Sequence, residues 1–281
     1  MSLRDLENCM NDITLELKRD IHTSLDSVLS LSRFNGELKN VFFCKCMIKP
    51  KFEWINGAMF SLLSAILRQR IEENGISVSF DFSETKPSIK DLFLKNGFFE
   101  YNSVVDPYNT IVPVKSFERT EIENFIEYIK TNFNVGKFPV PADFTGKIEN
   151  CLAEIFSNCE LHSQTRKVFS AGQYFPNKGK RGEFAFCLTD IGVGMTKLVK
   201  SKISTIATSE EAIRWAFTKN NTTIVDRPGG LGLNSLKEMV KNYTGTLIVV
   251  ANDIVFDVLQ NRSEKLPFDF DGTSIILTLT C

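Results

Sequence analysis

The segment Glu183-Phe-Ala-Phe-Cys-Leu-Thr-Asp190-Ile-Gly192-Val-Gly194 combines a run of strand-forming residues with an acid and two spaced glycines. The run predicts a strand, and Asp190 stands at its end, where a carboxylate can accept a hydrogen bond from an exocyclic amine. Gly192 and Gly194 lack the side chains that would keep a flat ring away. A plain Asp-Gly turn is the alternative, but a simple turn does not require this glycine spacing. The segment therefore predicts a site for a purine, and adenine fits it.

A helix is expected upstream, from about Ala142 to His162, because apolar residues recur there at helical spacing. The apolar residues that we expect to face the core are Phe144, Ile148, Leu152, Ile155 and Cys159. Glu154, Asn158 and His162 are each four residues apart and form a second stripe along the edge of the helix. A carboxylate and a carboxamide on one ridge can share a cation, although a solvated helix face would carry the same residue types.

Glycines gather again in Arg227-Pro-Gly229-Gly230-Leu231-Gly232-Leu233-Asn234, which opens the next expected helix. Glycines at a helix start expose free backbone N–H groups, and the helix macrodipole adds positive potential, so the segment favours an anionic phosphate. The chain has no G-x-x-x-x-G-K-[ST] motif, and Gly192-x-Gly194 is not completed to G-x-G-x-x-G. These departures exclude the P-loop and the dinucleotide-binding motif. Gly272-Thr273 is a fourth short motif near the end of the chain.

In this order and spacing the four motifs resemble those of the GHKL superfamily. That superfamily shares one ATP-binding fold, the Bergerat fold, among histidine kinases, DNA gyrase, a heat-shock chaperone class, mismatch-repair ATPases and anti-sigma-factor serine kinases. The resemblance covers roughly residues 118–281. It implies that the C-terminal half is a histidine-kinase-like ATPase domain with ATP and Mg²⁺ as its ligands.

The resemblance also implies a role for individual residues. The stretch from Glu154 to His162 corresponds to the N box, in which Asn158 would bind the magnesium ion that bridges the phosphates. Asp190 would hold the adenine amino group. The other residues expected around the nucleotide are Gly192 and Gly194 of the first glycine box, Gly230, Leu231, Gly232 and Leu233 of the second, Thr273, which would orient the adenine through its hydroxyl and a water, and His162. Residues 195–228 correspond to the mobile ATP lid, and their polar TKNNTT stretch is typical of a loop that orders on binding.

Glu154 is the expected catalytic residue. A water or a serine hydroxyl must lose a proton when it attacks phosphorus, so a nearby carboxylate can act as general base, whereas a neutral histidine acceptor needs none. Family members that hydrolyse ATP or phosphorylate serine are similar to this chain in having Glu at this position. His22 lacks the acidic neighbour and the proline of a phosphoacceptor box. ATP hydrolysis is therefore favoured over a protein serine kinase, and histidine autophosphorylation is disfavoured.

The first half alternates strand and helix patterns, which predicts an α/β layer domain. Helices are expected over residues 3–31, 55–73 and 88–95, with a break at Phe34-Asn35-Gly36, and strands over 41–48, 76–82 and 110–114. The prolines of the segment 107–113 place the boundary near Lys115, giving domains 1–115 and 116–281. In the second domain we expect helices at 118–132, 142–162 and 233–242, a hairpin of 168–175 and 183–190, and strands at 246–250, 254–259 and 274–280.

The stretches WINGAMFSLLSAIL, SVSFDFS and DLFLKNGFF of the first half resemble, more faintly, the STAS-like fold of anti-anti-sigma proteins. That family has a phosphorylatable serine where the long helix begins, but this chain has Trp54-Ile55-Asn56-Gly57 there. Serine phosphorylation at this point is therefore not expected. A STAS-like unit joined to an ATPase implies a regulatory protein whose first domain docks a protein partner.

Composition limits the other possible functions. The chain has 281 residues, 33 Lys and Arg against 34 Asp and Glu, and a net charge of −1, so it lacks the basic field that drives nonspecific nucleic-acid binding. Two histidines cannot build a multi-histidine metal site, and the seven cysteines include no C-x-x-C pair. The apolar stretches are too short to cross a bilayer, and no secretory signal is recognised, so we expect a cytoplasmic protein.

Three functions remain open on the sequence. The leading hypothesis is a regulatory protein that binds ATP and Mg²⁺ and hydrolyses ATP slowly, with lid closure coupled to binding of a protein partner. A serine/threonine protein kinase of the anti-sigma-factor type is the first alternative. A nucleotide-binding adaptor without catalysis is the second. The family resemblance also implies a possible homodimer, although no heptad repeat supports a zipper.

Overall fold

The computed structural model describes residues 12–99, 104–133, 144–162, 167–176, 182–223 and 230–280. The first unit contains β1 Ile13–Leu17, α2 Leu25–Lys39, β2 Lys45–Pro50, η2 Gly57–Met59, α3 Phe60–Asn74, β3 Ser77–Phe80 and α4 Pro87–Lys95. The remainder contains β4 Ile111–Glu118, α5 Ile122–Asn132, α6 Phe144–His162, β5 Lys167–Phe175, β6 Glu183–Asp190, α7 Met195–Lys202, α8 Ser209–Ala216, α9 Gly232–Asn242, β7 Thr246–Asp257 and β8 Arg262–Thr280. The expectation of a mixed α/β fold is confirmed.

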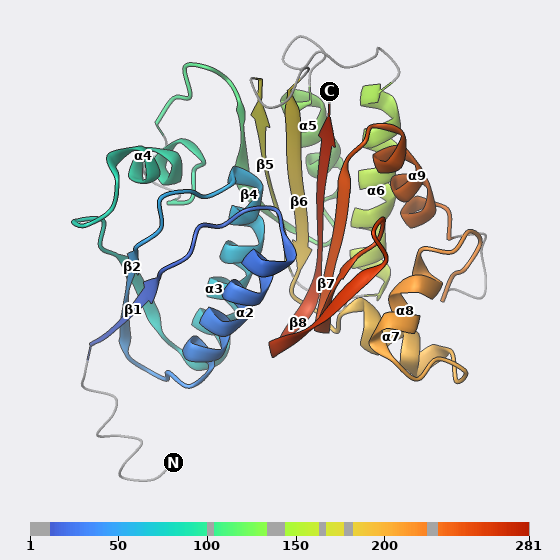
Figure 1. Ribbon diagram of the computed structural model, residues 1–281, viewed down its shortest axis with the longest axis horizontal. Helices are drawn as coiled ribbons and strands as arrows, with labels where there is room; N and C mark the ends of the chain where they lie inside the picture. The colour runs from blue at the N-terminus through green and yellow to red at the C-terminus, as the bar shows by residue number, and fades with distance from the viewer. Residues whose placement is uncertain are drawn as a thin grey trace.

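Within the described residues the strands form two sheets of different type. The first is parallel with the order β1-β2-β3, and the second is antiparallel with the order β4-β5-β6-β8-β7. Figure 1 shows α2 and α3 between the two sheets, and α5, α6 and α9 on the far side of the antiparallel sheet. The antiparallel sheet therefore has helices on both faces, and each face has its own core.

Alternation along β6 assigns side chains to these two faces. Ala185 and Cys187 join the core that contains α2 and α3, whereas Phe184, Phe186 and Leu188 join the core under α5, α6 and α9. This is the period of two that a strand imposes on its side chains. We call the two sides of the antiparallel sheet the N-terminal face and the cavity face.

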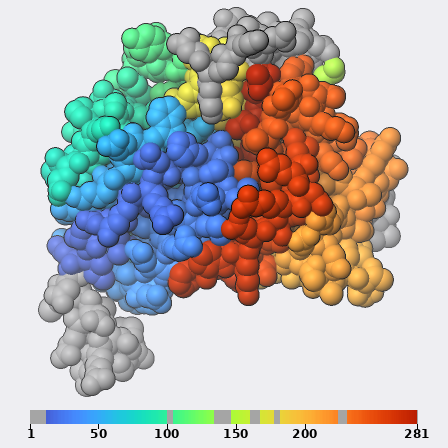
Figure 2. Space-filling view, viewed as in Figure 1, coloured from blue at the N-terminus to red at the C-terminus, as the bar shows by residue number. Residues whose placement is uncertain are grey.

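The first core is continuous across both halves of the chain. Leu31 of α2 and Leu63 of α3 belong to the same apolar cluster as Ile248 of β7 and Ile276 of β8. In Figure 2 the surface of the N-terminal half, in blue, lies directly against that of β8, in red. The N-terminal region is thus packed against the antiparallel sheet over a shared core. Lys115, the predicted boundary, lies inside β4, which pairs with β5 of that sheet.

The helix predicted over residues 3–31 is wrong over residues 12–24, and it is confirmed over residues 25–31, which belong to α2. Ile13, Leu15 and Leu17 are more buried than the residues between them, and this alternation fits the strand β1. The helix α2 begins only after Ser24, whose side chain accepts a hydrogen bond from the Ser27 backbone N–H as an N-cap.

The predicted break at Phe34-Asn35-Gly36 is also wrong, because all three residues lie inside α2. The reason is a tertiary contact. A Cβ atom built on Gly36 would come within 2.2 Å of the Phe268 ring, so the missing side chain allows β8 to pack against the helix. Glycine here serves close packing and does not end the helix.

Several other predictions are confirmed within a few residues. The helix α3 ends at Asn74, one residue beyond the predicted end at residue 73, and it is capped by Gly75 at φ 64°. The strands β5 and β6 pair antiparallel as the expected hairpin, whose predicted turn lies mostly outside the described residues. The two strands expected at 246–250 and 254–259 form one strand, β7, whose pairing with β8 is irregular around Asn252.

The expected lid region is not a long loop throughout. Residues 195–202 form α7 and residues 209–216 form α8, while residues 224–229 lie outside the described ranges. Thr208 and Glu211 build a reciprocal capping box that fixes the start of α8. Figure 1 shows both helices beside the β7–β8 end of the antiparallel sheet.

Candidate functional site

A cavity lies where α6, β6, α7, α8, α9 and β8 meet on the cavity face. Its empty space is about 880 Å³ including the solvent at its mouth. Eight of the predicted residues line it, namely Glu154, Asn158, Asp190, Gly194, Gly230, Gly232, Leu233 and Thr273. Residues that lie up to 119 positions apart in the chain therefore share one hollow, as the motif order predicted.

Other predicted residues are placed differently. Gly192 and Leu231 are not part of the cavity wall, and Leu231 is 47% exposed. His162 is the last residue of α6, and its side chain lies outside the description, as do Gly229 and Arg227 entirely. The cavity therefore brings together the acid, the carboxamide and most of the glycine motifs.

Asp190 is the most unusual group in the wall. It is 5% exposed and stands opposite Thr273 in the β6–β8 ladder. Its Oδ1 has no hydrogen-bond partner among the described residues, while Oδ2 lies 3.9 Å from the Cys159 Sγ. A buried polar atom without a partner is uncommon in folded proteins and points to a missing ligand or water.

Burial raises the pKa of Asp190 to about 7. The Thr273 backbone and hydroxyl, the Gly192 backbone and the Cys159 thiol all lower it, but less than desolvation raises it. The carboxyl group therefore changes its charge near neutral pH. A donor that entered the cavity and reached Oδ1 would favour the ionised form.

Gly272 explains how Thr273 comes so close to Asp190. Its φ is 148°, and a Cβ atom there would lie 2.0 Å from the backbone oxygen of Asp190. No side chain fits between these two backbones. The Gly272-Thr273 motif is thus a point of close strand approach, and Thr273 Oγ1 accepts a hydrogen bond from the Met195 N–H at 2.9 Å.

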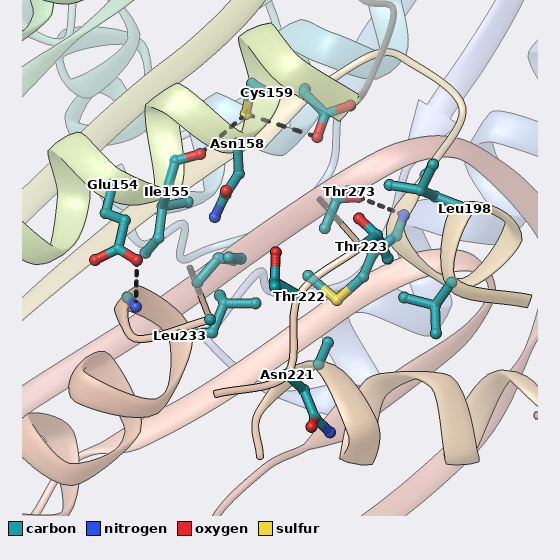
Figure 3. Close-up of a pocket in the computed structure, with 18 of the residues that line it drawn as sticks. Glu154, Ile155, Asn158, Cys159, Leu198, Asn221, Thr222, Thr223, Leu233 and Thr273 are labelled. Carbon is teal, nitrogen blue, oxygen red and sulfur yellow. Dashed lines mark hydrogen bonds between the residues drawn. The ribbon is translucent and has the colours of Figure 1, made fainter. Parts of the chain in front are cut away.

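Glu154 and Asn158 project from α6 into the opposite side of the cavity (Figure 3). Glu154 Oε1 accepts a hydrogen bond from the backbone N–H of Gly232 at 2.6 Å, and Gly232 is the first residue of α9. A Cβ atom on Gly232 would lie 2.5 Å from the Glu154 carboxyl carbon. The carboxylate therefore occupies the helix start at which the sequence predicted a phosphate, and α9 has no side-chain N-cap of its own.

Sequence reasoning missed part of the wall. Cys159 was expected only in the core, but it also lines the cavity beside Asp190. Trp215 of α8 and Thr222 and Thr223 after it contribute as well. The capping box around α8 is a sequence signal that could have located the Trp215 helix, whereas nothing in the sequence marks Cys159.

The described ranges contain neither a cluster of metal-ligating side chains nor a membrane-spanning helix. In these ranges no group of three or more His, Cys, Asp or Glu side chains is arranged to hold a metal ion. None of the helices in the part of the chain that the structure describes is long and apolar enough to cross a membrane.

No protein-family model and no curated protein matches the chain. Among solved structures the chain is similar to the histidine kinase domain of the blue-light activated histidine kinase of Erythrobacter litoralis EL346. The identity is 12%, the match covers 91% of this chain and 94% of that chain, and the TM-score is 0.29. Because a TM-score this low carries no argument, the case for the site rests on its geometry.

Proposed function

We propose that the chain is a regulatory protein that binds ATP with Mg²⁺ in the cavity on the antiparallel sheet and hydrolyses it slowly. The observation that carries the proposal is the unpartnered Oδ1 of buried Asp190 in a cavity that also contains Glu154 and Asn158. The motif resemblance to the GHKL superfamily supplies the choice of ATP.

The base end of the cavity suits a purine with an exocyclic amine. Asp190 offers an acceptor without a partner, and Leu188, Val199 and Ile275 supply apolar surface around it. An aromatic ring would pack against these side chains, and its amine would satisfy Oδ1. Adenine combines both properties.

The other end suits phosphates and a cation. Gly232 opens α9 with a backbone N–H that Glu154 holds in this structure and that a phosphate would have to take over, and Gly230 also lines the wall. Asn158 Oδ1 is an oxygen ligand of the kind that Mg²⁺ accepts, and Mg²⁺ is commonly bound by few protein oxygens together with substrate phosphates. When bound there, the ion would neutralise phosphate charge during transfer.

Glu154 is the candidate general base, because it is the carboxylate nearest the start of α9 among the cavity residues. In this structure its Oε1 holds the Gly232 N–H. To accept a proton from water it must turn one oxygen toward the attacking molecule. Slow turnover is expected if the Glu154 carboxylate is bonded to the Gly232 N–H for part of the time.

The same contact favours one alternative, a nucleotide-binding adaptor without catalysis. If Glu154 serves only as a cap for α9, its carboxylate has a structural purpose at this place. Phosphate release by purified protein separates the two functions, because Glu154→Gln abolishes it only if Glu154 is a base. Transfer of labelled phosphate to a protein hydroxyl would instead favour a serine/threonine kinase.

The N-terminal region is proposed to dock a protein partner. Its helices α2 and α3 share a core with the antiparallel sheet, so a partner bound to this region would act on the same sheet that carries Asp190 and Thr273. This packing supports coupling between nucleotide and partner without a flexible linker.

Calorimetric titration with a nonhydrolysable ATP analogue tests the proposed binding. We expect binding that strengthens with Mg²⁺, and we expect Asn158→Ala to remove most of the Mg²⁺-dependent part. Asn150→Ala is the matched control, because Asn150 is exposed on the same helix. Absence of binding by the intact protein, with and without Mg²⁺, would overturn the proposal.

A further inference from the structure

Asn252 is a buried side chain outside the cavity that holds one of its walls. It is 2% exposed, lies in the strand β7 and adopts a positive φ of 54°. The β7–β8 pairing is irregular on both sides of it, between Ala251 and Asn252 and between Asn252 and Ile254. A positive φ in a non-glycine residue within a strand is unusual, so the surrounding structure must favour it.

The carboxamide of Asn252 bonds to the loop that follows β6. Its Nδ2 donates to the Val193 carbonyl at 2.9 Å. Its Oδ1 accepts from the Thr196 hydroxyl at 2.7 Å and from the Lys197 backbone N–H at 3.1 Å. One side chain thus satisfies three groups on both sides of Gly194.

These bonds replace a cap that α7 lacks. Gly194 is the N-cap residue of α7 and has no side chain, whereas a helix start usually receives an acceptor from its own N-cap. Asn252 supplies that acceptor from a strand 55 residues away, at the third residue of the helix. Gly194 has a φ of 84°, and a Cβ atom there would lie 2.5 Å from the Asn252 carboxamide, so the loop and Asn252 fit only with glycine.

The loop that Asn252 holds forms part of the cavity wall. Gly194 and Met195 line the cavity together with Asp190 and Thr273, and the Met195 N–H bonds to Thr273 Oγ1. The spacing between this wall and Asp190 therefore depends on two side chains, Thr273 from inside the cavity and Asn252 from behind the wall. Asn252 itself is not part of the cavity wall.

We propose that Asn252 is a positioning residue that fixes the base end of the nucleotide site and thereby sets its preference for adenine over guanine. The inference rests on the proposed nucleotide binding and deepens it. Asp190 suits the exocyclic amine of adenine, and a guanine placed in the same orientation presents a carbonyl oxygen there. A wall held at one distance from Asp190 admits only one orientation of the ring, whereas a loosened wall lets guanine shift or turn.

The test compares the dissociation constants of nonhydrolysable ATP and GTP analogues. Asn252→Gly removes the carboxamide without straining the backbone, because glycine tolerates a positive φ. We expect it to reduce the ratio of ATP to GTP affinity about tenfold, mainly by weakening ATP, in line with the loss of a helix cap and a buried anchor. Asn261→Gly is the matched control, since Asn261 has a φ of 58° in the exposed β7–β8 turn.

Asn252→Asp provides a second variant. Its carboxylate can retain both acceptor bonds at the start of α7, but it replaces the donor to Val193 with an oxygen that repels the Val193 carbonyl, so we expect the ratio to fall in this variant as well. A general loss of stability would weaken both analogues equally and leave the ratio unchanged. An unchanged ratio in whichever of the two variants is folded at the assay temperature overturns the proposal. Failure of the wild-type protein to bind either analogue would instead overturn the proposed function itself.

Discussion

The two faces of the antiparallel sheet differ in the hydrogen bonding of their buried polar groups. On the N-terminal face, Thr189 and Ser274 are both fully buried, and their hydroxyls lie 2.8 Å apart. Ser61 of α3 donates to Thr189 Oγ1 at 2.9 Å. The next residue of β6, Asp190, points to the cavity face, and its Oδ1 has no hydrogen-bond partner among the described residues.

The two faces therefore differ in whether their buried polar groups are satisfied within the protein. A buried hydroxyl network that satisfies itself stabilises the packing of α3 on the sheet and needs nothing more. A buried carboxylate with a free acceptor destabilises the empty protein and is relieved by a ligand. The cavity face therefore gives up stability at the place where the site is proposed, and the predictions below test that division.

The largest expected effect is on the pH dependence of stability. Burial raises the pKa of Asp190 from 3.8 to about 7, so between these values the folded state binds more protons than the unfolded state. The free energy of unfolding should then fall as pH rises from about 4 to 7, by on the order of 4 kcal/mol from this group alone. Urea unfolding at several pH values should show this fall in the wild type relative to Asp190→Asn. If the free energy of unfolding changed equally with pH in the two proteins, burial of the Asp190 carboxylate would not destabilise the folded state.

The same substitution should weaken nucleotide binding. Asp190→Asn removes the charged acceptor for the base amine, and we expect the affinity for an ATP analogue to fall about tenfold to 100-fold. At pH 8 the variant should also be more stable than the wild type, so binding and stability change in opposite directions. Asp269→Asn, on an exposed part of β8, is the control and should change neither quantity. A variant that loses affinity and stability together would indicate a structural role for Asp190.

The sequence located the strands of this sheet because their signals are local. The run of strand-forming residues in β6 and the glycine that follows α3 are both local signals, and the strand and the helix end agree with the structure. The convergence of Glu154, Asn158 and Asp190 on one cavity also agrees with the motif order, although their roles stay predictions.

The failures have non-local causes. Gly36 resembles a helix breaker until Phe268, more than 200 residues away, is seen to pack against it. Asn252 carries no signal, because an asparagine in a strand pattern does not reveal that it caps α7. The α8 helix is different, since Thr208 and Glu211 form a capping box that is a local signal in the sequence for the start of a helix.

A smaller effect is expected on the N-terminal face. Thr189→Val keeps the shape of the side chain but removes its hydroxyl from the network with Ser61 and Ser274. Ser61 still donates to the Phe169 carbonyl, so the loss in free energy of unfolding should be about 1–2 kcal/mol. Nucleotide affinity should not change, because the residue faces away from the cavity. The exposed Thr14→Val on β1 is the control, and any fall in affinity for Thr189→Val would break the division between the faces.

The smallest effect should come from Glu154, which binds the α9 start in competition with phosphate. Glu154→Gln can still accept the Gly232 N–H but lacks the charge, so an ATP analogue should bind about twofold to fivefold more tightly, within the ~1 kcal/mol of a helix-end charge. Adenosine, which has no phosphate, should bind equally to both proteins, and the exposed Glu238→Gln on α9 should match the wild type. If adenosine gained as much affinity as the analogue, the carboxylate would be acting on the shape of the cavity and not on the phosphate. A gain confined to the phosphate-bearing ligand would mean that the Glu154 carboxylate occupies, in the empty cavity, the position that a phosphate takes in the complex.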